Sequence, residues 1–326
     1  MTETVTLTSL PIAGIALAVV AALLLSVGNE LQSRGVTKVS ARDDAPAGLG
    51  FKQVRRLFTN RGWLLGTLAL VAAILVQLAS LSLAPLIVVQ PVGVTALVFA
   101  ALLTAWFTKK LPSKRVARAI LICIAGVGVF VAVAAVVSVQ RPIRDSQLVA
   151  ILVVLCVVLV AIAVVFIVSR MRKAPVHPIV HVFAGGVLAG FVASLGKTVI
   201  LRVQSALSEL GEEFSFDSGM VLTGLCLLGI LVGGGLSIYF VQLSHTENKP
   251  EVVVAGLTVI DPVVAVVLGI VILGEAAGAP LWSVIVFVLA GAVAIAGVFL
   301  LSRAQNKDDR LADEALSAPS PEGPAR

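Results

Sequence analysis

Long apolar runs alternate with short polar stretches along almost the whole chain. Each run has about 20 residues or more, the length of helix that crosses the hydrocarbon core of a bilayer. The pattern predicts an all-α, polytopic membrane protein of about nine transmembrane helices, at residues 9–30, 62–84, 86–108, 117–139, 147–169, 178–203, 219–243, 250–273 and 281–302.

The composition excludes a water-soluble fold. Hydrophobic residues make up 59% of the chain and charged residues 13%, with a mean hydropathy of +1.07, whereas soluble domains are about 45–50% apolar and about 25% charged. The Lys and Arg residues behind the net charge of +6 sit in short stretches between apolar runs. That distribution favours a role in membrane topology, so we expect membrane lipid as a partner and no nucleic acid.

Basic residues concentrate in alternate connections, namely 34–61, 109–118, 170–177 and 244–250. These four segments hold sixteen Lys or Arg residues, far more than the other connections. Because basic connections stay on the cytoplasmic side, we expect a bacterial-type inner (plasma) membrane protein with its N-terminus outside and its C-terminus cytoplasmic. The charged and then Ser/Pro/Gly-rich tail, 303–326, is expected to be disordered.

The sequence resembles itself at an offset of 165 residues, which aligns Gln77 with Gln242, Pro85 with Pro250 and Gly126 with Gly291. Five helices separate equivalent elements, so the second copy would be inverted in the membrane, as in many alternating-access transporters. We therefore expect two inverted repeats in an arrangement of four, one and four helices. The expected segments are the first repeat (1–139), a linking helix (140–177), the second repeat (178–302) and the cytoplasmic tail (303–326).

Several stretches resemble the drug/metabolite transporter (EamA-like) superfamily: 84–93 (APLIVVQPVG), 261–265 (DPVVA) followed by 273–275 (LGE), and 194–197 (SLGK). Within that superfamily, the nine-helix plan and residues 28–35 (GNELQSRG) are similar to the NIPA-like magnesium transporters. The resemblance covers about residues 10–302. It implies a transporter in which the family's acidic position, at the end of the helix after the Pro-containing stretch, is Glu275 in the second half. The equivalent residue in the first half is Lys110, and a cation in place of an anion argues against magnesium.

Charged residues deep within a membrane helix are costly, at about 2.5–3.5 kcal/mol each on insertion scales, and they mark functional sites. Asp261 lies near the middle of the helix at 250–273, beside Pro262. The proline removes a backbone donor and frees the carbonyl of Thr258. Asp261 could therefore ligate a cation, exchange a proton as access alternates, or bond to a neighbouring hydroxyl.

Lys197 is the second charged candidate and follows Ser194 within the helix at 178–203. It could pair with Asp261, bind an anionic group of the substrate, or extend to the membrane interface. We include Ser194 with it as a candidate ligand. A buried lysine at a cation site would repel Mg²⁺ unless it is paired, so Lys197 also argues against magnesium.

Three further positions complete the candidate substrate or ion site. Glu30 is either an interfacial carboxylate facing Arg34 or part of a gate at the cytoplasmic end of the first helix. Gln77 could bond across helices or line a cavity, and Pro91 could kink the cavity wall. We expect the first, third, sixth and eighth helices to line this cavity.

The chain contains no nucleotide-binding, nucleophile or metal motif, so we expect no enzyme activity, no cofactor and no metal centre. The leading function is a secondary transporter that moves a small organic solute or metabolite across the inner membrane by alternating access. A divalent-cation (magnesium) transporter is the alternative, and a non-transporting scaffold or accessory in envelope-lipid assembly is the second. The expected partner is a small molecule or an ion, and the sequence leaves a homodimer open.

Overall fold

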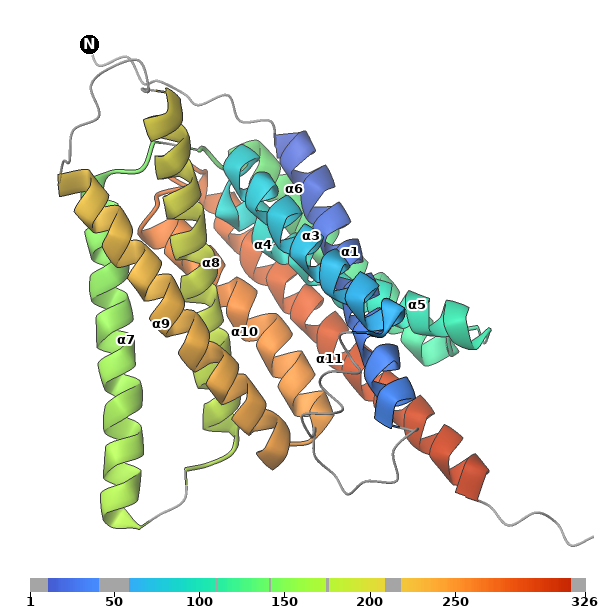
Figure 1. The fold of residues 1–326 in the computed structure, drawn as a ribbon. Coiled ribbons are helices and arrows are strands. Elements are labelled where there is room, and N and C mark those ends of the chain that lie inside the picture. The colour runs from blue at the N-terminus through green and yellow to red at the C-terminus, as the bar shows by residue number, and fades with distance from the viewer. Residues whose placement is uncertain are drawn as a thin grey trace, which may run out of the picture.

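The structure is a computed structural model and describes residues 11–40, 59–109, 111–140, 142–173, 176–208 and 218–317. Every regular element in these residues is a helix (Figure 1). The helices are α1 (Pro11–Ser40), α3 (Arg61–Leu83), α4 (Leu86–Gly93), α5 (Thr95–Thr108), α6 (Lys114–Val137), α7 (Asp145–Arg172), α8 (Ile179–Ser208), α9 (Ser218–Glu247), α10 (Pro250–Val271) and α11 (Leu281–Ser317).

Nine helical segments of the described residues are long and apolar enough to cross a membrane, with α4 and α5 together forming one of them. This confirms the predicted all-α membrane fold with nine spanning helices. Two helices extend clearly beyond the expected bounds: α1 continues to Ser40 although we expected it to end near residue 30, and α11 continues to Ser317 where we expected disorder from residue 303. The stretch 303–317 is rich in Ala, Leu and oppositely charged residues, all compatible with a helix. Residues 318–326 of the expected disordered tail lie outside the described residues.

Local sequence signals set several helix ends. The side chain of Asn60 accepts a hydrogen bond from the backbone N–H of Trp63 at the start of α3, and Ser113 caps α6 in the same way. Helix α3 ends at Leu83 because Pro85 disfavours helical backbone in the residue before it. The corner at Ala84 and Pro85 turns the chain directly into α4.

The tightest helix contacts occur where glycine replaces a side chain. Gly126 on α6 faces Ala294 on α11, and a Cβ on Gly126 would lie 2.4 Å from the backbone nitrogen of Ala294. Gly28 on α1 and Gly66 on α3 face each other in a similar way, because a Cβ on either would lie within 3.0 Å of the other's carbonyl oxygen. Close approach of small residues is the main way in which membrane helices associate.

Helices α1 with α3, α8 with α9, and α6 with α11 form the most extensive packing pairs. The first two pairs would be equivalent under the 165-residue offset, and α6 would be equivalent to α11. The inverted repeat and the four segments derived from it nevertheless stay predictions, since packing pairs alone do not establish an internal symmetry.

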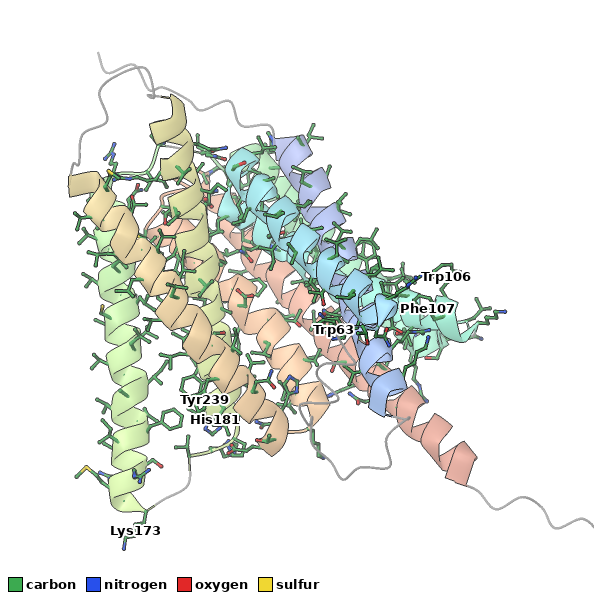
Figure 2. All side chains as sticks on the ribbon, in the orientation of Figure 1. Trp63, Trp106, Phe107, Lys173, His181 and Tyr239 are labelled. Carbon is green, nitrogen blue, oxygen red and sulfur yellow. The ribbon has the colours of Figure 1, made fainter. Side chains whose placement is uncertain are left out.

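The two ends of the bundle differ. We call the corner end the one that holds Ala84, Pro85 and the loop 272–280 between α10 and α11. Helix α1 starts at this end and α11 finishes at the other (Figure 1). Trp63, Trp106, Phe107, Tyr239 and Lys173 all lie away from the corner end (Figure 2). The guanidinium of Arg34 stacks over the Phe107 ring there, at 3.9 Å from its centroid. Aromatic and basic residues of this kind gather at membrane interfaces.

Candidate functional site

Glu275 lies in the loop 272–280 and caps the N-terminus of α4. Its Oε1 accepts a hydrogen bond from the backbone N–H of Leu86 and its Oε2 one from Ile87, both at 2.8 Å. These N–H groups are free because the first turn of a helix leaves its donors without partners. The carboxylate also lies at the positive end of the α4 dipole, which favours a negative charge.

Lys197 on α8 completes this network. Its Nζ lies 2.8 Å from Oε1 of Glu275 and donates a hydrogen bond to the carbonyl of Ala84 at 2.9 Å. The side chains of Lys197 and Glu275 are 1% and 4% exposed, respectively. Of the three roles that the sequence left open for Lys197, pairing with Asp261 and extension to the interface are not found, because its partners are Glu275 and the Ala84 carbonyl. The ammonium finds a carboxylate and a carbonyl close by inside the bundle, and these offset the cost of its burial.

Further hydrogen bonds tie the corner end together. The backbone carbonyl of Glu275 accepts from the N–H of Val139, at 2.8 Å. The side-chain amide of Gln140 donates to the carbonyl of Ser82, at 3.0 Å, and so joins the segment before α7 to the end of α3. The amide of Gln147 on α7 donates to the carbonyls of Ile272 and Leu273 after α10, both at 3.1 Å. These bonds connect α3, α4, α7, α8 and the loop 272–280.

Asp261 lies halfway along α10 and is separate from this network. Its Oδ1 is buried and has no hydrogen-bond partner among the described residues. Pro262, the next residue, has no N–H to give to the carbonyl of Thr258, as predicted from the sequence. Buried polar atoms in proteins are nearly always paired, so the unpartnered oxygen makes Asp261 a candidate ligand for a cation or for a bound water.

Helix α8 passes very close to Asp261. A Cβ on Gly190 would lie 2.8 Å from the carbonyl oxygen of Asp261, and a Cβ on Gly186 would lie 2.8 Å from the Cβ of Ile260. The GxxxG spacing of these two glycines therefore marks a close helix contact in this chain. It places the carboxylate-bearing turn of α10 against the backbone of α8, the helix that also carries Lys197.

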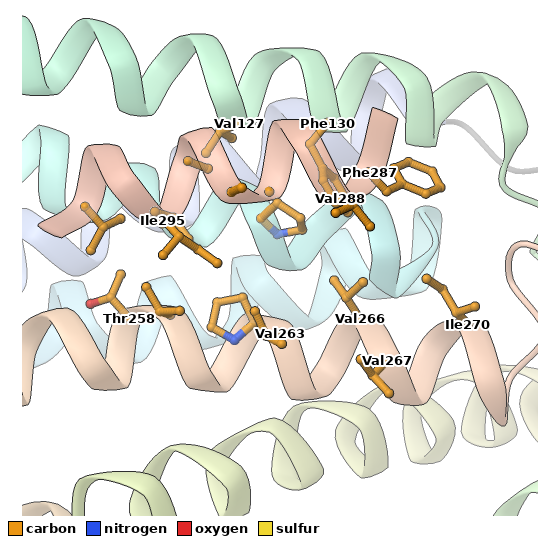
Figure 3. Close-up of a pocket in the computed structure, with 18 residues that line it drawn as sticks. Val127, Phe130, Thr258, Val263, Val266, Val267, Ile270, Phe287, Val288 and Ile295 are labelled. Atoms are coloured by element: carbon orange, nitrogen blue, oxygen red, sulfur yellow. The ribbon is translucent and has the colours of Figure 1, made fainter. Parts of the chain in front are cut away.

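A pocket of about 370 Å³ opens between α10 and α11, with α4 and α6 contributing to its walls. Val263, Val266 and Ile270 of α10 lie opposite Phe287 and Ile295 of α11 in Figure 3. Both Pro91 and Pro262 line the pocket. The lining is apolar, and the helices around it are the third, fourth, eighth and ninth spans, whereas the cavity was expected among the first, third, sixth and eighth.

The remaining candidates lie apart from one another. Glu30 pairs with Arg34 one turn later on α1, at 2.6 Å between Oε1 and Nε, as expected of an interfacial carboxylate. The hydroxyl of Ser194 is buried and donates to the carbonyl of Gly190 on its own helix, at 2.9 Å. Gln77 is half-buried on α3. Lys110, which the sequence places opposite Glu275 in the repeat, lies outside the described residues.

The structure thus brings together Lys197 and a residue that sequence reasoning left out of the site, Glu275. The only signal in the sequence was the family resemblance at 273–275. The Ala84 carbonyl and the N–H groups of Leu86 and Ile87 could not be found from the sequence, because backbone groups at a turn carry no residue-type signal.

No group of three or more His, Cys, Asp or Glu side chains within the described ranges is arranged to hold a metal ion. Mg²⁺ does not need such a group, because it usually keeps several of its waters and takes only one or two carboxylates from a protein.

Residues 10–307 match the model of the family described as "Magnesium transporter NIPA". Comparisons with curated proteins and with solved structures gave no match. The matched range begins just before α1 and ends within α11, so it includes all nine spans and both the Lys197–Glu275 pair and Asp261. This chain therefore belongs to the NIPA magnesium transporter family and is a membrane transporter.

Proposed function

We propose that this protein transports Mg²⁺ across the membrane and that the carboxylate of Asp261 binds the ion midway along its path. Magnesium transport is the activity named for the family, and it was the alternative to the organic-solute function placed first on the sequence. The observation that carries the proposal is the buried, unpartnered Oδ1 of Asp261.

The ion pairs of the other acidic side chains support this role for Asp261. Glu275 pairs with Lys197, Glu30 with Arg34, and Asp145 with Arg202. Each of these carboxylates already has a cation beside it. Asp261 has none among the described residues, so its negative charge is available for an ion that arrives from outside the fold.

The sequence argument against magnesium loses much of its force. It rested on Lys110 and on a buried, unpaired Lys197. Lys197 is instead neutralised by Glu275 and donates a hydrogen bond to the Ala84 carbonyl. A neutral ion pair does not repel a nearby Mg²⁺ as an isolated ammonium would, because its field falls off faster with distance.

Uptake of Mg²⁺ into proteoliposomes that contain a fluorescent Mg²⁺ indicator tests the proposal. The loss of a charged ligand should weaken the free energy of Mg²⁺ binding by about 1.5–3 kcal/mol. Asp261→Asn should therefore lower uptake about ten- to a hundredfold at limiting Mg²⁺. Asp145→Asn is the matched control, because it makes the same chemical change at the start of α7. Equal uptake by Asp261→Asn and the unmodified protein would refute the proposal.

The apolar pocket supports a second candidate function, the transport of a lipophilic organic compound. Val263 and Val267 line the pocket and are 45% and 50% exposed, so the pocket opens onto the lipid-facing surface between α10 and α11. Selective stabilisation of the protein by an apolar solute, together with unchanged Mg²⁺ uptake in Asp261→Asn, would favour this function. Membership of a transporter family supports either function over that of a scaffold.

We also propose that the corner end faces the outside of an inner (plasma) membrane and that the end with Trp63, Trp106 and Lys173 is cytoplasmic. This orientation follows from the basic connections, all of which are expected at the second end. Labelling of single cysteines by a membrane-impermeant reagent in intact cells tests it. A cysteine at the exposed Ala277, in the loop 272–280, should react, and one at Lys173 should not.

A further inference from the structure

We propose that Lys197 is a tethered cation that fills a second cation site, formed by the Glu275 carboxylate and the Ala84 carbonyl, and that the transported ion takes its place during transport. The inference rests on the proposed function, since it assumes that a small cation moves through the protein.

The atoms around Nζ of Lys197 are those that bind hard cations. The ammonium has a carboxylate oxygen at 2.8 Å and a backbone carbonyl oxygen at 2.9 Å. Carboxylate and carbonyl oxygens are also the protein ligands of Mg²⁺ and Ca²⁺. The site therefore has the donor chemistry of an ion site, and a lysine of this chain occupies it.

The site is built closely around the Glu275 carboxylate. A Cβ on Gly269 would lie 2.9 Å from Oε2, so the absence of a side chain on α10 leaves room for the carboxylate. The N–H groups of Leu86 and Ile87 hold the two oxygens in place. The carboxylate would keep this position without Lys197, because its anchors are backbone groups at a helix N-terminus.

The second site lies on the same helix as Asp261. Gly269, which contacts the Glu275 carboxylate, is eight residues after Asp261 on α10. At 1.5 Å per residue the two positions are about 12 Å apart along the helix axis. The Asp261 carboxylate has an unpartnered oxygen, whereas the Glu275 carboxylate is paired with Lys197. An ion that moves from Asp261 toward the corner end would therefore compete with Lys197 for Glu275.

Exchange at this site would also release a structural tie. Lys197 connects α8 to the corner at Ala84 and to the loop 272–280. When an ion binds Glu275 in its place, the ammonium leaves and α8 loses both contacts. Binding of the ion at Glu275 and separation of α8 from the corner end would then be coupled. Such coupling would let the ion shift the protein toward a conformation in which this end is open.

The test uses Mg²⁺-dependent thermal unfolding of the full-length protein in detergent, with choline chloride to keep the ionic strength constant. The background is Asp261→Asn, which silences the first site. Lys197→Met should then bring back stabilisation by MgCl₂, at a concentration at least about tenfold lower than any response of Asp261→Asn alone, because a tethered competitor acts at millimolar or higher effective concentration. Adding Glu275→Gln should abolish the response again.

Two further variants keep the test decisive. Lys197→Arg retains the cation and should behave like the unmodified residue. Lys197→Gln removes the competing cation but keeps a polar side chain in the buried position, so it should gain the Mg²⁺ response even if Lys197→Met does not fold. If folded Lys197→Met protein is obtained only when Mg²⁺ is present, that result also supports the proposal, because it shows that Mg²⁺ stabilises this variant.

The two proposals fail in different ways. A full Mg²⁺ response in Asp261→Asn alone counts against Asp261 as the ion ligand and leaves the second site to be judged by the Lys197 variants. Absence of any gain in both Lys197→Met and Lys197→Gln, or a gain that persists in the presence of Glu275→Gln, would overturn the tethered-cation proposal whatever the role of Asp261.

Discussion

Glu275 binds the N–H of Ile87 at 2.8 Å although the two residues are 188 positions apart in the chain. Each lies beside a turn between two spans: Ile87 follows the corner at Pro85, and Glu275 follows α10. The carboxylate therefore joins the first part of the chain to the last at one end of the bundle. Lys197, from the middle of the chain, binds the same carboxylate.

Removal of this carboxylate should destabilise the protein strongly. In Glu275→Ala the ammonium of Lys197 stays buried with only the Ala84 carbonyl as its partner, and breaking a buried pair in this way costs about 3–5 kcal/mol. The midpoint of thermal or denaturant unfolding in detergent measures the loss. Glu247→Ala is the control: Glu247 lies 2.8 Å from His181, but its side chain is 37% exposed. Similar losses in the two variants would contradict the prediction.

The contact between α6 and α11 should depend on one glycine and tolerate change at its neighbour. The Cβ of Gly126→Ala would lie 2.4 Å from a backbone atom of α11, which cannot move aside as a flexible side chain can. Overpacking of this kind costs about 1–3 kcal/mol or more. Gly128, two residues later on α6, has no atom within 4 Å of the same added methyl group. Gly128→Ala should therefore leave the unfolding midpoint unchanged or raise it slightly.

Pro262 should lower the stability of α10 and, at the same time, leave a free backbone carbonyl beside Asp261. Pro262→Ala restores an N–H that can bond to the carbonyl of Thr258, which should stabilise α10 by about 1 kcal/mol or more. We expect lower Mg²⁺ uptake at the same time, because the site beside Asp261 loses a free carbonyl oxygen. Pro250→Ala is the control, since Pro250 is at the start of α10, where an N–H has no partner within the helix. Undiminished uptake in Pro262→Ala would show that the free carbonyl has no role.

The Glu30–Arg34 pair should matter little. The side chains of Glu30 and Arg34 are 23% and 42% exposed, and they are one helical turn apart. Such pairs contribute about 0.3–0.5 kcal/mol. Glu30→Gln should therefore leave both the unfolding midpoint and Mg²⁺ uptake close to those of the unmodified protein. A loss of uptake above about tenfold without a loss of stability would instead assign Glu30 to a gate.

Filling the apolar pocket separates the two candidate functions. Val263→Phe adds a ring at the mouth of the pocket, and Val284→Phe adds one at a 54% exposed position on α11 that does not line it. If the pocket lies off the ion path, Mg²⁺ uptake should be equal in the two variants. Selective loss of uptake in Val263→Phe would place the pocket on the path.

The nine spans were predictable because each needs only a long apolar run, and the bilayer makes that signal strong. The close contact of α8 with α10 could not be assigned in the same way, because the spacing of Gly186 and Gly190 permits a close contact but does not say which helix makes it. The partner of Lys197 was not predictable either. Its choice of Glu275 over Asp261 depends on how α8 lies against the corner at Ala84, and on backbone donors that Pro85 exposes by ending α3. Hydrophobicity alone does not predict how far a helix continues outside the membrane, as α11 does beyond residue 303.

Helix α7 should make the corner end sensitive to the thickness of the membrane. Its apolar stretch runs from Leu148 to Val168 and corresponds to about 32 Å of helix, which is close to the thickness of about 30 Å of the hydrocarbon core of a typical bilayer. A helix of this length tilts more as the bilayer thins. Since the side-chain amide of Gln147 near its first turn donates to the carbonyls of Ile272 and Leu273, we expect that tilt to displace the loop that carries Glu275. We therefore expect the lipid composition around α7 to affect the geometry of the Lys197–Glu275 pair.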